Sequence, residues 1–141
     1  MTTTRKILCG IYAAISAAAL IATWTQNAAY FGNSAGFLKN FVQDLTITPA
    51  SRSITVDIVL FFLAAAIFMV LEARKIGVPY VWAYIAGGLL IAISVTFPLF
   101  LIARERKLAA TDAPGLKTLD VILLVALAAV SASWVIFTVS S

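Results

Sequence analysis

The chain has 141 residues, of which 62% are hydrophobic and 11% are charged, and its mean hydropathy is +1.03. A soluble domain has about 25% charged residues, so this chain lacks the polar surface needed to face water on all sides. We therefore predict a membrane protein with a single transmembrane domain over residues 1–141. Because it has no His and a single Cys, the sequence excludes an internal disulfide, a Cys/His zinc site and a His-based catalytic triad.

The net charge is +4, which makes the chain basic. In a membrane protein such an excess is more typical of anionic lipid headgroups and of membrane orientation than of nucleic-acid binding. The aromatic residues lie mostly within apolar runs, and no basic and aromatic platform for bases is evident. We expect membrane lipids as partners and no nucleic acid.

The first apolar segment predicts a spanning helix over about residues 7–24. It follows a short polar lead that ends in Arg5 and Lys6. A cleaved signal peptide is the alternative interpretation, with these two cations as its basic region. The uncharged run continues to Leu38, which is longer than the apolar core of a signal peptide, so we expect the helix to be retained.

Small residues recur at every fourth position of this helix, at Gly10, Ala14, Ala18 and Ala22. This spacing places them on one face, and small side chains let two helix backbones approach closely in lipid. We expect this small-residue stripe to pack against another helix. Packing within the chain is the simpler interpretation, and packing against a partner is the alternative.

Residues 25–53 form the longest stretch that is not expected to cross the membrane. Within it, apolar residues fall at helical spacing with polar residues on the other side, and this pattern predicts a short amphipathic helix at about residues 35–46. Such a helix is typical of one that lies in the membrane interface, and a lid over the bundle is the alternative. The apolar positions are Phe37, Leu38, Phe41, Val42 and Leu45.

Two further apolar segments predict a pair of spanning helices over about residues 54–72 and 79–103. At about 1.5 Å per residue, each nearly reaches or exceeds the hydrocarbon thickness of about 30 Å. The second segment carries no charged residue. In lipid an apolar run satisfies its own backbone hydrogen bonds as a helix. Gly87 and Gly88 are further candidates for close helix packing.

A charged turn joins these two predicted helices. Arg74 and Lys75 suit the C-terminal end of a helix, where cations complement its dipole, and Glu72 beside them is interpreted as a solvated charge. Gly77 can adopt the positive φ that ends a helix, and Pro79 suits the first turn of the next. The turn is followed by aromatic residues typical of the membrane interface, Tyr80, Trp82 and Tyr84.

Several features of this region follow one another in a recognisable order. They are an acidic residue near a helix start, a Glu-x-Arg-Lys-x-Gly turn at residues 72–77, aromatic residues after it, and the run Phe97-Pro98-Leu99-Phe100-Leu101 ahead of Arg104-Glu105-Arg106. In this respect the chain resembles the DUF2834 family of small bacterial membrane proteins, over about residues 10–108. The resemblance implies a helical membrane fold. The family has no known function, so the resemblance supplies no catalytic residues.

The last apolar segment predicts a spanning helix over about residues 119–139. We therefore expect an all-α membrane protein, a four-transmembrane-helix bundle with a short amphipathic interfacial helix between helices 1 and 2. Four crossings place both termini on one side, which we expect to be the cytoplasmic side of a bacterial plasma (inner) membrane. The Lys and Arg count opposes this orientation, because it places more of them outside than inside, but the first helix usually dominates.

Asp57 is the one carboxylate that lies about a turn inside a predicted spanning helix. An ionisable group there is costly, which makes Asp57 a candidate functional residue. Its expected partner is Arg52, just outside the helix, or Arg104 or Arg106 at the facing end of the hairpin, or the loop of residues 25–53. The simpler interpretation is a salt bridge at the interface or an anion that complements the helix dipole.

The sequence contains no GxGxxG motif, no P-loop and no nucleophile elbow, and no residue set predicts a cofactor or metal, so we do not expect an enzyme. We expect a non-enzymatic accessory or structural subunit of a larger bacterial membrane complex, in contact with other subunits or with copies of itself. The alternative is a small transporter or lipid-binding membrane protein that uses Asp57 in a cavity between helices. An intramembrane enzyme acting on a lipid has the least support.

Overall fold

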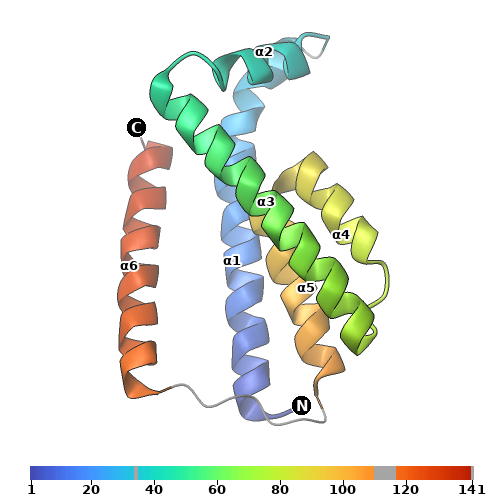
Figure 1. The fold of residues 1–141 in the computed structure, drawn as a ribbon. Helices are drawn as coiled ribbons and strands as arrows, with labels where there is room; N and C mark the ends of the chain where they lie inside the picture. Colours follow the sequence, from blue (N-terminus) through green and yellow to red (C-terminus); the bar gives the residue numbers. More distant parts are fainter. Residues whose placement is uncertain (34, 110–116, 141) are drawn as a thin grey trace.

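The computed structural model describes residues 1–33, 35–109 and 117–140, and these residues form helices and loops without a strand (Figure 1). Four segments are long and apolar enough to cross a membrane, and a short helix lies at one end of them. The predicted all-helical class is therefore confirmed. In chain order the elements are α1 (Thr3–Asn27), η1 (Ala28–Asn33), α2 (Phe37–Asp44), α3 (Pro49–Ile76), α4 (Val81–Gly87), η2 (Gly88–Ala92), α5 (Ile93–Lys107) and α6 (Thr118–Ser140).

Helix α2 lies across the end of the bundle that is uppermost in Figure 1. The ring of Tyr30 in η1 contacts the rings of Phe37 and Phe41, with centroids 6.1 and 5.7 Å apart. The Tyr30 hydroxyl also donates a hydrogen bond to the Asp44 carboxylate at 2.7 Å. These contacts hold the aromatic face of α2 against η1.

Helix α3 begins before residue 54 because the preceding residues form a complete N-terminal cap. The Ser51 N–H donates to the Thr48 hydroxyl at 3.0 Å, and the Thr48 N–H donates to the Ser51 hydroxyl at 3.1 Å. Pro49 occupies the first turn, where its missing N–H is not needed. At the other end, Gly77 has a φ of 75° and ends α3 in the left-handed conformation, as predicted.

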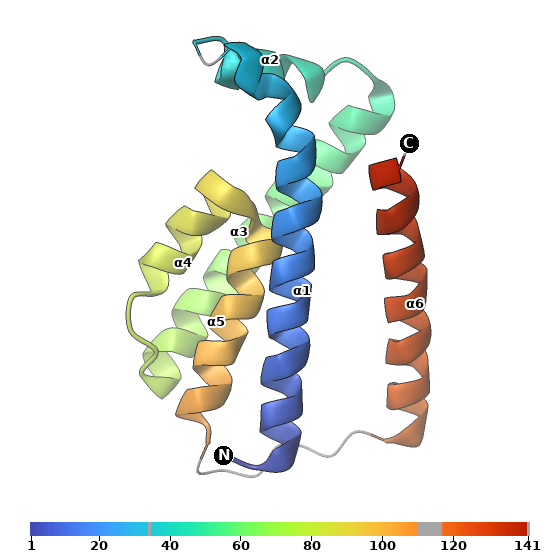
Figure 2. The ribbon, with the colours of Figure 1, turned by 180° about the vertical axis from the view of Figure 1, so that it is seen from behind.

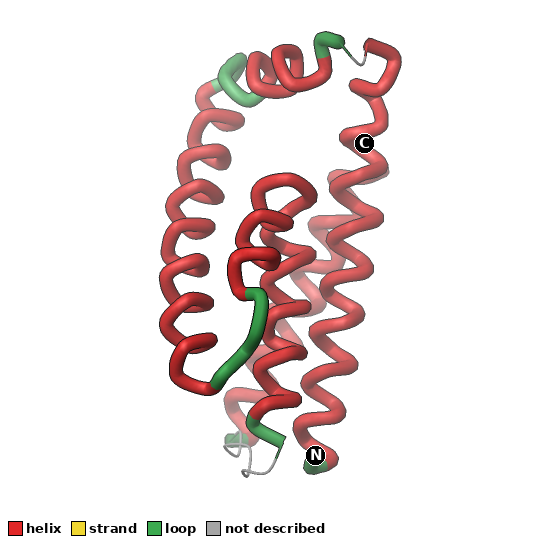
Figure 3. The backbone as a smooth tube through the Cα atoms, turned by 90° about the vertical axis from the view of Figure 1, so that its right-hand side faces the viewer, coloured by secondary structure: helices red, strands yellow, loops and turns green. Residues whose placement is uncertain are grey.

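The stretch from α4 to α5 folds back on itself as a helical hairpin (Figure 3). The Tyr84 ring lies edge-on to the Phe100 ring with centroids 5.8 Å apart, whereas a continuous helix would separate these residues by about 24 Å. A Cβ added at Gly87 would lie 3.0 Å from Thr96 Cγ2, so the two arms touch near the tip. The reversal occurs at Ala92, whose φ of −178° and ψ of 142° are extended rather than helical.

Helix α5 runs antiparallel to α1. The Ser16 hydroxyl donates to the Val95 carbonyl at 2.9 Å, near the start of α5. Arg5, near the start of α1, forms an ion pair with Glu105, near the end of α5. The end of α5 therefore lies beside the N-terminus of the chain (Figure 2).

Helix α5 also runs parallel to α3. The Phe68 ring contacts the Phe100 ring at 6.4 Å between centroids, and Glu72 forms an ion pair with Arg104 one turn further along both helices. The hairpin thus begins and ends at the same end of the bundle. Helix α6 then runs back toward the other end, so the two termini lie at opposite ends (Figures 1 and 2). This differs from the expected arrangement, in which both termini share a side.

The same topology gathers positive charge at the end of the bundle that contains the starts of α1 and α6 and the ends of α3 and α5 (Figure 1). We call this the basic end. Of all Lys and Arg residues, only Lys39 and Arg52 lie elsewhere. The expected orientation placed more Lys and Arg residues outside than inside, because it assumed that residues 79–103 cross the membrane as one straight helix. With the hairpin, most of these residues lie at one end of the bundle, and the conflict no longer arises. The cations of the basic end are Arg5, Lys6, Arg74, Lys75, Arg104, Arg106, Lys107 and Lys117.

The buried core is small and lies between α3 and the hairpin. Helix α6, in contrast, has no buried residue and packs only loosely against α1. Most of the apolar side chains therefore face outward, which is expected where lipid rather than water surrounds the helices. The core consists of Met69, Ala73, Val78, Val81, Ile85 and Phe100.

Candidate functional site

A chain of ion pairs joins three helices at the basic end. Arg5 of α1 donates from Nη1 to the Glu105 carboxylate of α5. Arg104 donates from Nη1 to Glu105 Oε1 at 2.9 Å and from Nε to Glu72 Oε1 of α3 at 2.8 Å. These four residues, which we call the charge network, alternate in sign and link α1, α5 and α3.

The charge network is most shielded where α1 meets α5. Arg5 is 3% exposed and Glu105 is 4% exposed, while the side chains of Arg104 and Glu72 are 29% and 14% exposed. Removing one member of a buried ion pair leaves the other charge uncompensated, which typically costs about 3–5 kcal/mol. The network therefore opposes any separation of the three helices at this end.

The pairing of the carboxylates restricts the chemistry of this cluster. Both Glu72 and Glu105 accept hydrogen bonds from guanidinium groups, and the four charges sum to zero. Within residues 1–33, 35–109 and 117–140, no group of three or more His, Cys, Asp or Glu side chains is placed to hold a metal ion. The arrangement is that of a structural clamp between helices.

The candidate residues Asp57, Arg52 and Arg104 are not brought together. Asp57 and Arg52 lie near the start of α3, away from the basic end, and Arg104 lies near the end of α5. Asp57 is exposed and forms no ion pair with another described residue. Arg52 donates from Nη1 to the Thr46 carbonyl at 2.8 Å. The expected pairing of Arg104 with Asp57 does not occur, because the hairpin carries Arg104 to the opposite end.

Sequence reasoning did not identify the other members of the charge network. In the sequence, Arg5 was interpreted as part of the polar lead and Glu72 as a solvated charge of the turn. Glu105 lies within a basic cluster after the third predicted helix. A signal was nevertheless present. Glu72 and Arg104 carry opposite charges at the ends of two apolar segments and are therefore able to pair if the two ends meet.

The small-residue stripe is not covered by any part of the chain that the structure describes. Gly10, Ala14 and Ala18 are exposed and Ala22 is half-buried, and a Cβ added at Gly10 would meet nothing within 4 Å. The α1–α5 interface uses the face that carries Ser16 instead. Packing of the stripe within the chain, which was the simpler interpretation, is therefore not found.

The two glycines of the hairpin do lie at a close approach of helices. A Cβ added at Gly88 would lie 2.8 Å from Phe62 Cε2 of α3 and 3.1 Å from Thr96 Oγ1 of α5. Gly87 faces Thr96 as well. These glycines therefore leave the space that lets the tip of the hairpin pack between its own second arm and α3.

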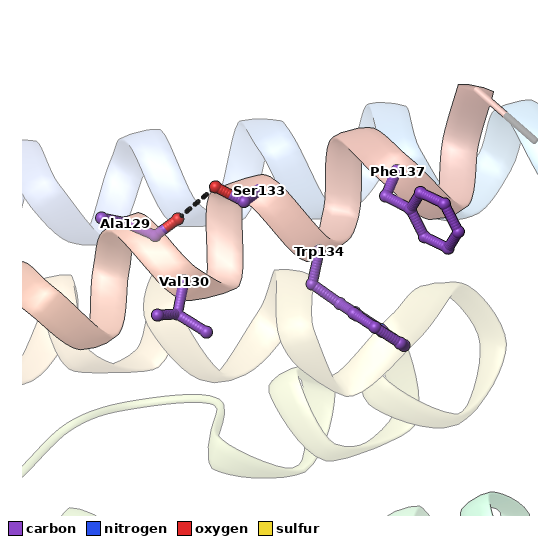
Figure 4. A pocket seen from close by; sticks show the side chains of 5 residues that line it. All are labelled: Ala129, Val130, Ser133, Trp134 and Phe137. Atoms are coloured by element: carbon purple, nitrogen blue, oxygen red, sulfur yellow. Dashed lines mark hydrogen bonds between the residues drawn. The ribbon is translucent and has the colours of Figure 1, made fainter.

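A shallow apolar groove of about 380 Å³ lies on α6 (Figure 4). Its lining comes entirely from α6. The Ser133 hydroxyl donates to the Ala129 carbonyl at 2.9 Å, so this polar group is satisfied within the helix. The groove thus presents small and aromatic apolar surface. It is lined by Ala129, Val130, Ser133, Trp134 and Phe137.

Comparison with known proteins identifies one family. The family model described as "Protein of unknown function DUF2834" matches residues 11–106. The matched segment contains most of α1, all of α2 and α3 and nearly all of the hairpin, and it leaves α6 outside. This match confirms the resemblance drawn from the motifs between residues 57 and 106. No curated protein and no solved structure matches the chain.

Proposed function

The chain belongs to the DUF2834 family, and we propose that it serves as a non-enzymatic accessory or structural subunit of a larger complex in a bacterial plasma membrane. The observation that carries this proposal is the small-residue stripe of α1, which the described part of the chain leaves uncovered. The partner that fits it is a transmembrane helix of another subunit.

The small-residue stripe turns away from the bundle. Ser16 is buried against α5. Ala14 and Ala18, two residues to either side of Ser16, fall about 160° around the helix from it. Lipid can cover an exposed apolar face of any composition, whereas a stripe of small residues is favoured where a second helix packs closely. The stripe is therefore suited to a protein partner.

Helix α6 offers a second surface of the same kind. No described residue of α6 is buried, and its groove combines the small residues Ala129 and Ser133 with the rings of Trp134 and Phe137 (Figure 4). A ring from a neighbouring subunit can rest against the small positions while the aromatic side chains close around it. Helix α6 thus provides a second surface for assembly beside the small-residue stripe.

The distribution of charge supports one orientation in the membrane. Lys and Arg are favoured in short cytoplasmic segments, and the basic end carries every such residue except Lys39 and Arg52. We accordingly infer that the basic end and the N-terminus face the cytoplasm and that the C-terminus faces the other side. This replaces the expectation of two cytoplasmic termini.

The proposal is tested by gentle detergent extraction of the tagged full chain from the membranes of its natural host, with quantification of the proteins that remain bound. We expect stoichiometric foreign subunits with the natural sequence. The double variant Ala14→Leu/Ala18→Leu should release them, because its larger side chains prevent close helix approach. The control is Ala64→Leu, which makes one substitution of the same kind at an exposed position of α3.

Two outcomes contradict the proposal. One is a chain that is recovered only as copies of itself, with no foreign subunit in stoichiometric amount. The other is a set of foreign subunits that the stripe variant retains as fully as the Ala64→Leu control does. The rival function, transport that depends on Asp57, is not favoured, because Asp57 is exposed and has no ion-pair partner among the described residues.

A further inference from the structure

A second groove lies along the hairpin at the basic end and has a volume of about 690 Å³. One wall is formed by Pro79, in the loop after α3, and by Tyr84 of α4. The Tyr84 ring is held in place by its edge-on contact with the buried Phe100 ring. The other wall is a face of α5. The groove thus has a rigid aromatic side and a helical side.

The α5 wall changes from apolar to basic along its length. Leu99, Ile102 and Ala103 form its first part, and Arg106 and Lys107 form its last part. These positions recur every three or four residues, so they share one face of the helix. Helix α5 ends at the basic end (Figure 1). The cations therefore lie at the outer end of the groove, and the apolar side chains lie deeper along the bundle.

The two cations of the groove are not neutralised by the part of the chain that the structure describes. Arg106 and Lys107 are exposed and form no ion pair there. Arg104, only two positions away, is held by two carboxylates instead. Two adjacent cations at the outer end of an apolar groove are complementary to a molecule with an anionic head and a hydrocarbon tail.

We propose that this groove binds an anionic phospholipid. The lipid phosphate contacts Arg106 and Lys107, and one acyl chain lies along Leu99 and Ile102 against the Tyr84 ring. A soluble anion would use only the cations and leave the apolar wall uncovered. A zwitterionic lipid would use the wall but gain less from the two positive charges. The site lies on the hairpin rather than on the stripe or α6, so it does not depend on the proposed function.

Binding is measured by native mass spectrometry of the delipidated full chain in detergent, titrated separately with phosphatidylglycerol and with phosphatidylcholine. We expect tighter binding of phosphatidylglycerol. The double variant Arg106→Gln/Lys107→Gln should weaken phosphatidylglycerol binding roughly 25-fold, because each cation near a lipid headgroup contributes about a fivefold effect. The matched control is Arg74→Gln/Lys75→Gln, which removes two exposed charges at the same end but outside the groove.

A second variant tests the apolar wall. Leu99→Trp adds bulk to the groove without changing its charge, and we expect it to weaken the binding of phosphatidylglycerol, whereas Leu63→Trp on the exposed face of α3 should not. An unchanged circular dichroism spectrum and elution volume show that each variant is folded. If the Arg106→Gln/Lys107→Gln variant does not fold, Leu99→Trp still tests the groove. Inorganic phosphate is added as a competitor and should displace little lipid.

Three results would overturn the proposal. Equal loss of binding in the Arg74→Gln/Lys75→Gln control shows that only the overall surface charge matters. Efficient displacement by inorganic phosphate, together with no effect of Leu99→Trp, shows a site for a soluble anion. Equal affinity for phosphatidylglycerol and phosphatidylcholine in the natural sequence shows that the two cations do not select the lipid.

Discussion

Arg104 Nε donates a hydrogen bond to Glu72 Oε1 at 2.8 Å, and this contact places the ends of α3 and α5 at the same end of the bundle. The apolar stretch between these two residues therefore leaves that end and returns to it. The stretch is long and apolar enough to cross a membrane, yet its two ends lie at one end of the bundle. The chain direction of α6, the position of the C-terminus and the gathering of cations all follow from this one reversal.

The reversal predicts which side of the membrane each segment faces. In a Cys9→Ser background, which removes the single native thiol, Lys75→Cys and Lys107→Cys should react with a membrane-impermeant maleimide from the same side. A straight third crossing would place these two positions on opposite sides. Labelling is measured in intact cells and in inverted membrane vesicles prepared from them.

The termini provide the matching control for this experiment. Thr4→Cys should react from the same side as Lys107→Cys, and Ser140→Cys should react from the opposite side. Labelling of Thr4→Cys and Ser140→Cys from one side would contradict the arrangement in Figure 1. It would instead support the four straight crossings that hydropathy alone indicates.

The charge network predicts that a single isosteric substitution lowers the stability of the protein strongly. Glu105→Gln keeps the shape of the side chain but removes the buried carboxylate that pairs with both Arg5 and Arg104, so we expect a loss of about 3–5 kcal/mol in stability. Removing both charges with Arg5→Gln/Glu105→Gln should cost less than Glu105→Gln alone, because the buried positive charge is removed together with the carboxylate that pairs with it. Stability is measured as the midpoint of thermal unfolding in mild detergent.

The control for the charge network is Asp57→Asn, which neutralises an exposed carboxylate with no ion pair among the described residues. We expect it to change the free energy of unfolding by less than about 0.5 kcal/mol. Equal effects of Glu105→Gln and Asp57→Asn would show that the network does not hold the helices together.

The N-terminal cap of α3 predicts a local effect. Thr48→Ala removes the hydroxyl that accepts from the Ser51 N–H, and the expected cost is about 1 kcal/mol. Amide hydrogen exchange at Ser51 and Arg52 should accelerate, while exchange in the middle of α3 stays slow. Thr46→Ala serves as the control, because the Thr46 hydroxyl bonds the Gln43 carbonyl outside α3. Unchanged exchange in Thr48→Ala would show that the cap does not stabilise this helix start.

Local sequence signals predicted that the apolar segments are helical, because hydropathy and caps act between neighbouring residues. Gly77 ends α3 as expected, and the four apolar segments are helical. The reversal at Ala92 was not predicted, because Gly87 and Gly88, a turn signal close to it, were interpreted as residues for close helix packing. Leu89, Leu90 and Ile91 are apolar and exposed at the tip, as suits a turn that faces lipid, and hydropathy cannot distinguish such a turn from a continuing span.

The charge network was hidden for a different reason. Arg5 and Glu105 are 100 positions apart, and each lies in a polar segment that looks solvated when considered alone. Their burial depends on the antiparallel packing of α1 and α5, which depends in turn on the reversal. A prediction of the network therefore required the topology first.

At the hairpin tip, we predict that a larger side chain in place of Gly88 is sterically unfavourable. A Cβ at this position would lie 2.8 Å from Phe62 Cε2, 3.1 Å from Thr96 Oγ1 and 3.2 Å from Ile93 Cδ1. No single neighbour can relieve these contacts, because they come from three side chains on two helices. Gly88→Ala should therefore destabilise the protein by about 1–3 kcal/mol through overpacking, despite the better helix propensity of Ala.

Gly10 supplies the matched control for this prediction, because a Cβ there would meet nothing within 4 Å. Gly10→Ala should leave the unfolding midpoint of the isolated chain unchanged or raise it slightly, since Ala is the better helix former. If Gly88→Ala also raised the midpoint, the tip would not be packed against α3 as described. The pair of variants thus compares the same added methyl group at a closed and at an open position of one bundle.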